Sequence, residues 1–145
     1  MAIEIKNKQG EVLKVLKSNI SANLVGADLT AAALSYANFT CCFFEEADLS
    51  GADLSHSNLV GSDFDSAILT NTDFSGSDCS GADFDCACCE NTDFSNANLT
   101  GVNFCNADLT GANFQGAILK DVDFDGADLS GVDFKGADLT GVNFG

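Results

Sequence analysis

The chain of 145 residues contains no proline and no tryptophan, and its 6 lysine and arginine residues are far outnumbered by 22 aspartate and glutamate residues. The net charge of −16 leaves no basic surface to neutralise phosphates, so direct nucleic-acid binding is not expected. No stretch approaches the roughly 20 apolar residues of a membrane-spanning helix, and residues 1–5 lack the pattern of a signal peptide. We therefore expect a cytoplasmic protein without membrane contact.

Apolar residues are nevertheless frequent enough to form a core. Leu, Ile, Val and Phe together exceed a quarter of the chain, which is above the roughly 20% below which acidic chains stay disordered. The 14 glycines and 12 phenylalanines indicate an internal repeat.

The repeat has a period of five. From Leu24 to Phe144 every fifth residue is Leu, Phe or Cys, the residue two positions earlier is small, and the residue between them is usually Asp or Asn. A helix has a period of 3.6 and a strand a period of 2, so each unit must be a short extended segment followed by a turn. The small residue and the Leu or Phe then point inward, Asp or Asn points outward, and Gly, Asn or Ser occupies a corner where φ is positive.

Units such as residues 127–131, ADLSG, resemble the pentapeptide-repeat family, whose repeat is written A(D/N)LXX. The resemblance covers residues 22–145 and implies an all-β fold, a right-handed quadrilateral β-helix with four pentapeptides per coil. This length corresponds to about six coils, and at ~4.8 Å per layer the rod is roughly 30 Å long.

Stacking every twentieth residue supports a four-sided coil. We number the faces one to four by the first inward residue on each, namely Leu24, Leu29, Leu34 and Phe39. Faces one and three then become columns of phenylalanine, whereas faces two and four carry mostly leucine. Alternating large and smaller side chains around a coil fills a narrow interior.

Residues 1–21 lie outside the repeat. Apolar and polar residues alternate in residues 3–6 and 11–15, around a polar stretch at 7–10, which predicts a β-hairpin. Because the open end of a solenoid needs a cover, we interpret residues 1–21 as a hairpin cap on the domain formed by residues 22–145.

The repeat also assigns an orientation to each cysteine. Three are predicted to point inward: Cys42, Cys79 and Cys89. Four are predicted to face outward or to lie at corners: Cys41, Cys86, Cys88 and Cys105. We interpret them as small apolar side chains in a reducing cytosol rather than as a metal or redox cluster, because the adjacent Cys88 and Cys89 point to opposite sides. A disulfide formed on oxidation between Cys86 and Cys105, which neighbour each other on adjacent coils, is the weaker alternative.

No catalytic residue, cofactor or metal site is expected. The only histidine, His56, lies at a corner one coil from Tyr36, and no nucleophile shares its column. Four apolar residues replace the usual Asp or Asn and mark either a contact surface or a tightly packed face: Phe43, Ile68, Cys88 and Ile118.

Acidic residues are concentrated on face one, where they form a candidate interaction stripe. The stripe consists of Glu45, Asp63, Asp65, Asp83, Asp85, Asp123 and Asp125. We therefore expect a non-enzymatic acidic rod that acts by surface contact with a protein partner.

The family resemblance implies an alternative, since some members imitate DNA, bind DNA gyrase and protect it from fluoroquinolones. A charge of −16 over roughly 30 Å is one charge per ~1.9 Å, close to the ~1.7 Å of duplex DNA.

The last coil predicts a second contact. Phe134, Leu139 and Phe144 have no further coil above them, so two chains meeting tail to tail would bury both ends in a closed two-fold dimer. The resemblance implies the same arrangement, because some family members dimerise through their C-terminal coils. A monomer with a frayed last coil is the alternative.

Overall fold

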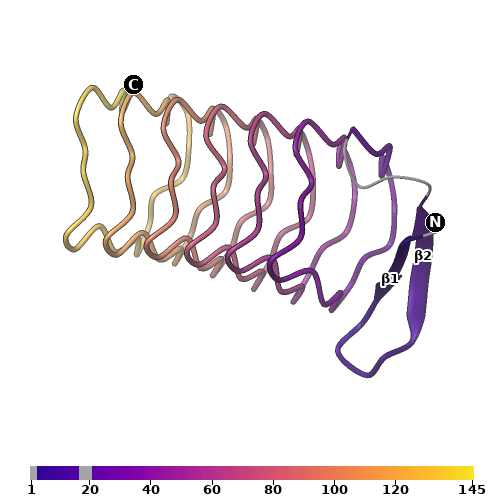
Figure 1. The fold of residues 1–145 in the computed structure, drawn as a ribbon. Helices are drawn as coiled ribbons and strands as arrows, with labels where there is room; N and C mark the ends of the chain where they lie inside the picture. The colour runs from indigo at the N-terminus through magenta and orange to yellow at the C-terminus, as the bar shows by residue number, and fades with distance from the viewer. Residues whose placement is uncertain (1–2, 17–20) are drawn as a thin grey trace.

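The structure is a computed structural model that describes residues 3–16 and 21–145; residues 1–2 and 17–20, which belong to the expected cap, lie outside the described residues. Residues 21–145 form a stack of coils, with a two-stranded hairpin at one end and the C-terminus at the other (Figure 1). The described residues contain no helix. The β-helix expected from the repeat is therefore confirmed.

The coils are held in a fixed register. Parallel bridges join each outward residue to its counterpart one full coil later, from Asn23 with Phe43 to Asp123 with Asn143. Backbone hydrogen bonds connect neighbouring coils throughout; for example, the N–H of Leu54 donates to the carbonyl of Asp73 at 2.7 Å. Because the register never slips, equivalent side chains of successive coils form continuous columns.

Every corner turns through a left-handed residue. The N–H of Ser57 donates to the carbonyl of Leu54 at 3.2 Å, and His56 between them has a φ of 56°, as the third residue of a type II turn requires. The same φ recurs at every fifth residue and confirms the expected corners, none of which is β-branched.

Two columns of phenylalanine fill the interior. Phe84 is fully buried, and its ring stacks on those of Phe64 and Phe104 with centroids 4.8 and 4.9 Å apart. It also meets the rings of Phe74 and Phe94 on the opposite face edge-on, at 5.8 and 5.7 Å. Both arrangements are favourable for aromatic pairs, and they confirm the predicted inward columns on faces one and three.

Hydroxyl groups at inward positions are hydrogen-bonded to the backbone. Ser62 donates to the carbonyl of Phe39 at 2.7 Å, and Thr72 donates to the carbonyl of Leu49 at 2.8 Å. A buried hydroxyl without a partner would cost about 1–3 kcal/mol. These bonds allow Ser and Thr to replace alanine in the core.

The hairpin consists of antiparallel strands β1 (Ile3–Lys6) and β2 (Val12–Leu16). Its second strand begins one residue later than expected, because Glu11 belongs to the turn, where its N–H donates to the side chain of Asn7 at 2.9 Å. Gly10 in this turn has a φ of 86°.

The hairpin packs against the first coil on face three. Ile5 is buried in the common core. Asn7 forms an antiparallel bridge with Ala32, and the N–H of Ala33 donates to the carbonyl of Lys6 at 2.7 Å. The side chain of Lys8 reaches the carbonyl of Gly51 at 3.1 Å. These contacts extend the edge of the first coil by one segment.

Candidate interaction surface

Most outward Asp and Asn side chains also shape the backbone. On face one, the N–H of Asp65 donates to the carboxylate of Asp63 at 3.0 Å, and the N–H of Asp85 donates to Asp83 at the same distance. The repeat pattern alone assigned these acids a surface role only. Equivalent bonds recur around the coils, so the side chain fixes the approach to each corner. The sequence already contains the pattern behind these bonds: in most repeats an Asp or Asn stands two residues before the residue whose N–H it binds.

Face one presents two parallel columns of acids. Asp63 and Asp83 pair across adjacent coils, and Asp65 and Asp85 lie two residues further along the same coils. Glu45 precedes them on the coil below. The register thus brings five of the predicted residues together in one block.

The remaining two stripe residues lie beyond a gap. Asn103 and Cys105 occupy the coil next to Asp83 and Asp85, and Asp123 and Asp125 follow on the coil after that. The stripe is therefore divided into a block of five carboxylates and a separate pair.

The other faces have a different pattern. On face three, the residue after the inward side chain is often serine, and the Ser55 hydroxyl donates to Asp53 at 2.7 Å. On face four, Thr100 donates to Asn98 at 2.8 Å. A hydroxyl thus stands where face one has a second carboxylate, so face one carries the densest negative charge.

Asparagine follows aspartate in several columns. The side-chain amide of Asn103 donates to Asp83 at 3.0 Å, and that of Asn143 donates to Asp123 at 2.8 Å. The backbone N–H of Asp125 and the amide of Asn143 lower the pKa of Asp123 against the opposing effect of burial. These pairs relieve charge repulsion between stacked acids. The sequence analysis did not predict these Asn–Asp hydrogen bonds, although the period of twenty residues places each asparagine next to its aspartate on the adjacent coil.

The N-terminal end of the stripe is partly apolar. Phe43 is 43% exposed, and Val25, which lies below Glu45 in its column, is 47% exposed. One carboxylate oxygen of Glu45 is buried without a hydrogen-bond partner. The sequence analysis identified Phe43 as a departure from the repeat, but it did not single out Val25.

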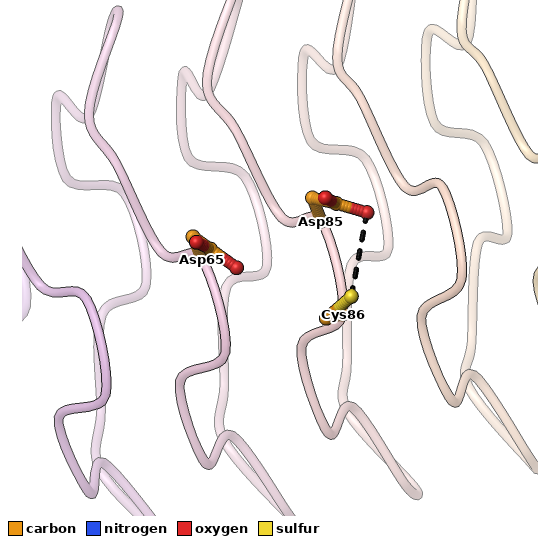
Figure 2. Close-up of side chains that lie close together, drawn as sticks. All are labelled: Asp65, Asp85 and Cys86. Atoms are coloured by element: carbon orange, nitrogen blue, oxygen red, sulfur yellow. Dashed lines mark hydrogen bonds between the residues drawn. The ribbon is translucent and has the colours of Figure 1, made fainter.

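Three side chains of the stripe region form a compact cluster (Figure 2). The carboxylate oxygens of Asp65 and Asp85 and the sulfur of Cys86 lie within 4.8 Å of one another, and the thiol donates to Asp85 at 3.6 Å. Desolvation and the negative charge of Asp85 raise the pKa of the Cys86 thiol. Metals bind the thiolate, whereas the raised pKa favours the protonated thiol of Cys86. The cluster by itself therefore does not define a metal site.

The cysteines lie as the repeat predicts. Cys42, Cys79 and Cys89 are buried, and burial raises the pKa of Cys79 to about 12 and that of Cys89 well above its usual range. Exposed or half-buried positions are taken by Cys41, Cys86, Cys88 and Cys105.

His56 belongs to a surface stack. Its imidazole lies against the ring of Tyr36, with centroids 5.0 Å apart and planes 22° apart.

The described residues enclose no pocket, and they contain no helix long and apolar enough to cross a membrane.

The last coil exposes apolar side chains. Phe144 is 52% exposed and Leu139 is 40% exposed, while Phe134 is partly buried. In the described part of the chain, the N–H groups of these three residues have no backbone acceptor.

A family model agrees with the repeat pattern. The family model described as pentapeptide repeats (8 copies) matches residues 20–51, 27–65, 47–85, 62–101, 87–126 and 107–145. No curated protein matches the chain.

Several solved structures are similar. HetL, a pentapeptide repeat protein involved in heterocyst differentiation regulation from Nostoc sp. strain PCC 7120, is 25% identical over 84% of this chain and 72% of its own, with a TM-score of 0.37. A trypsin-treated variant of QnrB1, a plasmid-mediated fluoroquinolone resistance protein, is 25% identical over 85% and 72%, with a TM-score of 0.48. Rfr23 from the cyanobacterium Cyanothece 51142 is 26% identical over 87% and 90%, with a TM-score of 0.38.

Proposed function

The chain belongs to the pentapeptide-repeat family, and we propose that it acts without catalysis, as an acidic rod in the cytoplasm that binds a basic protein partner through face one. The observation that carries this proposal is the pair of carboxylate columns on that face. Asp63, Asp65, Asp83 and Asp85 form its centre, on two adjacent coils. In this proposal the coils provide the rigid support, and the hairpin acts as the cap of the N-terminal end.

A rigid carboxylate surface favours a partner that presents lysine or arginine side chains. Coils stack about 4.8 Å apart, so neighbouring carboxylates are close enough for one basic residue to contact two of them. The coils also hold the stripe in an ordered arrangement before the partner binds, so less conformational entropy is lost on binding. Exposed charges are screened by salt beyond about 10 Å at 0.1 M ionic strength, so binding should weaken as salt rises.

The test compares two variants of equal charge. In the first, Asp63, Asp65, Asp83 and Asp85 become asparagine. In the second, the same change is made on face three at Asp53, Asp73, Asp93 and Asp133. Six of these aspartates, all except Asp65 and Asp85, accept a hydrogen bond from a backbone N–H two residues later. Asparagine preserves this bond, since Asn103 and Asn113 make it in the native chain, so both variants are expected to fold.

The probe is a synthetic lysine- and arginine-rich peptide, and its affinity is measured by isothermal titration calorimetry. The face-one variant is expected to lose about tenfold in affinity, or ~1.4 kcal/mol. The face-three variant is expected to lose much less. Equal losses would mean that net charge alone attracts the peptide and would reject face one as the binding surface.

DNA gyrase is the alternative partner. The charge of −16 gives the rod a linear charge density near that of duplex DNA, which is the basis for imitation of DNA at a basic channel. A supercoiling assay tests this alternative with the same pair of variants. Inhibition that weakens with salt and with the face-one substitutions supports it, and an unchanged supercoiling rate at micromolar protein removes it.

A further inference from the structure

Two accessible cysteines lie side by side on face one. The N–H of Cys86 donates to the carbonyl of Cys105 at 2.9 Å, which places the two residues on adjacent coils in direct backbone contact. Cys86 is exposed and Cys105 is half-buried. Neither is itself one of the stripe carboxylates, and Cys105 lies where the column of carboxylates is interrupted between Asp85 and Asp125.

The register places their Cα atoms at a distance that suits a disulfide. Residue 106 stacks on residue 86 about 4.8 Å away, and Cys105 precedes it by one residue, or about 3.8 Å along the chain. The two cysteine Cα atoms are therefore about 6 Å apart, within the range of about 4.4–6.8 Å that disulfides occupy.

The present rotamers hold the two sulfurs on separate acceptors. The thiol of Cys86 donates to Asp85, and that of Cys105 is hydrogen-bonded to Asp123. Both side chains are at the surface, so disulfide formation requires each thiol to leave its acceptor by rotation about its Cα–Cβ bond. Desolvation and the surrounding carboxylates raise the pKa of both thiols, so they react slowly at neutral pH.

We propose that hydrogen peroxide oxidises Cys86 and Cys105 to an intramolecular disulfide between adjacent coils of face one, slowly at neutral pH and faster as the pH rises. In the first step, Cys86 releases its thiol proton and the thiolate attacks one oxygen of hydrogen peroxide. The O–O bond breaks, Cys86 becomes a sulfenic acid, and the departing hydroxide takes up a proton to become water. In the second step, Cys105 releases its thiol proton, its thiolate attacks the sulfur of the sulfenic acid, and the S–O bond breaks; the departing hydroxide becomes a second water. Two thiols lose two electrons and two protons, and one peroxide is reduced to two waters.

The disulfide lies beside Asp85, at the edge of the block of carboxylates on the candidate interaction surface. It links two consecutive coils, closes a loop about one coil long, and removes the thiol that donates to Asp85. Closing such a loop restricts the unfolded chain, so the oxidised rod is expected to denature at a higher urea concentration than the reduced one.

The experiment treats the full chain with hydrogen peroxide at pH 8.5 and counts free thiols before and after. Four thiols should react in the reduced native protein, and two should remain after oxidation, with a mass loss of about 2 Da. Digestion with a protease that cleaves before aspartate should give residues 85–92 joined to residues 93–107. A thiol reductant should separate them.

Single variants assign the roles. Cys105→Ser should leave a sulfenic acid on Cys86 that dimedone traps, and Cys88→Ser should form the same disulfide as the native chain. A bond between Cys86 and Cys88, a disulfide that persists in Cys105→Ser, or four free thiols after peroxide treatment would each overturn the proposal. Even if a variant fails to fold, fragmentation of the joined peptides of the native chain by mass spectrometry identifies which of the three cysteines in residues 85–92 is bonded to Cys105.

Discussion

Roughly half of the corner residues hold a side chain in a backbone conformation that normally selects glycine. Tyr36, Glu46 and His56 all have a φ between 56° and 59°. The left-handed conformation costs a non-glycine residue roughly 1–2 kcal/mol, so the cooperative hydrogen bonds of the neighbouring coils must offset this cost at each such corner. The repeat predicted the positive φ from the frequency of Gly, Asn and Ser, but it gave no sign that tyrosine or histidine would tolerate it.

Two glycines with the same φ separate backbone strain from crowding. A Cβ on Gly81, with a φ of 65°, would meet nothing within 4 Å, whereas a Cβ on Gly76, with a φ of 64°, would lie 2.6 Å from Nδ1 of His56. Gly81→Ala should therefore cost roughly 1–2 kcal/mol and Gly76→Ala more. The difference, measured by urea denaturation, should disappear when His56 is also replaced by alanine. Equal costs for both variants in the native background would contradict the crowding by His56.

Acid should weaken the turns that aspartate fixes. The Thr30 hydroxyl and, to a smaller extent, the Thr30 N–H lower the pKa of Asp28. A group whose pKa is lower in the folded state stabilises that state above its unfolded pKa of about 3.9, and loses this contribution as the pH falls through its folded pKa.

Asp28→Asn isolates this contribution, because asparagine keeps the acceptor oxygen but does not titrate. The native chain should exceed the variant in urea midpoint at pH 6, and the difference should shrink as the pH falls below about 4. A difference that stays constant between pH 6 and pH 3 would show that the charge of Asp28 does not stabilise its turn.

At the scale of the elements, the columns of phenylalanine connect each coil to the next. Phe84 touches four other rings, so its removal leaves a cavity that rigid neighbouring coils do not fill. Phe84→Ala should lower the free energy of unfolding by ~3–5 kcal/mol.

Phe144→Ala is the matched control, because that ring is half-exposed and lies at the end of the same column. It should cost clearly less than Phe84→Ala in the same chemical denaturation experiment. A native-like midpoint for Phe84→Ala would contradict the inward column.

The elements also show which features the sequence predicts. The columns, corners and inward cysteines follow from a period of five, because a repeat imposes one environment on every copy. The contact of the hairpin with face three at Ala32 does not follow, since one irregular segment has no second copy to define its register. The hydrogen bond from the side chain of Asn103 to Asp83 does not follow either, because it depends on side-chain rotamers, which residue spacing alone does not determine.

At the scale of the whole molecule, the two ends of the rod differ. The hairpin extends the edge of the first coil, whereas the coil that ends at Phe144 presents unpaired N–H groups and apolar side chains. We propose that two chains of this sequence associate through Phe134, Leu139 and Phe144, although two rods of charge −16 repel each other. End-to-end contact keeps most of the acids apart and closes with two-fold symmetry.

Light scattering at moderate salt tests this association. A dimer should have twice the mass of 15.0 kDa, and Phe144→Asp should restore the monomer by placing a charge in the contact. The same substitution at Phe43, which is exposed on the side of the rod, should leave the mass unchanged. A mass of one chain at every concentration would reject the dimer.

The pairing of each residue with its counterpart one coil later also restricts how a gene encoding such a rod gains or loses length. Loss of residues 86–105 removes one whole layer and leaves every later side chain on its original face. Loss of residues 86–90 instead rotates everything downstream by one side, so that Asp123 moves to face four and Phe124 enters a leucine column. Insertions and deletions in related genes should therefore occur in steps of one whole coil, or else form loops that leave the coil at a corner.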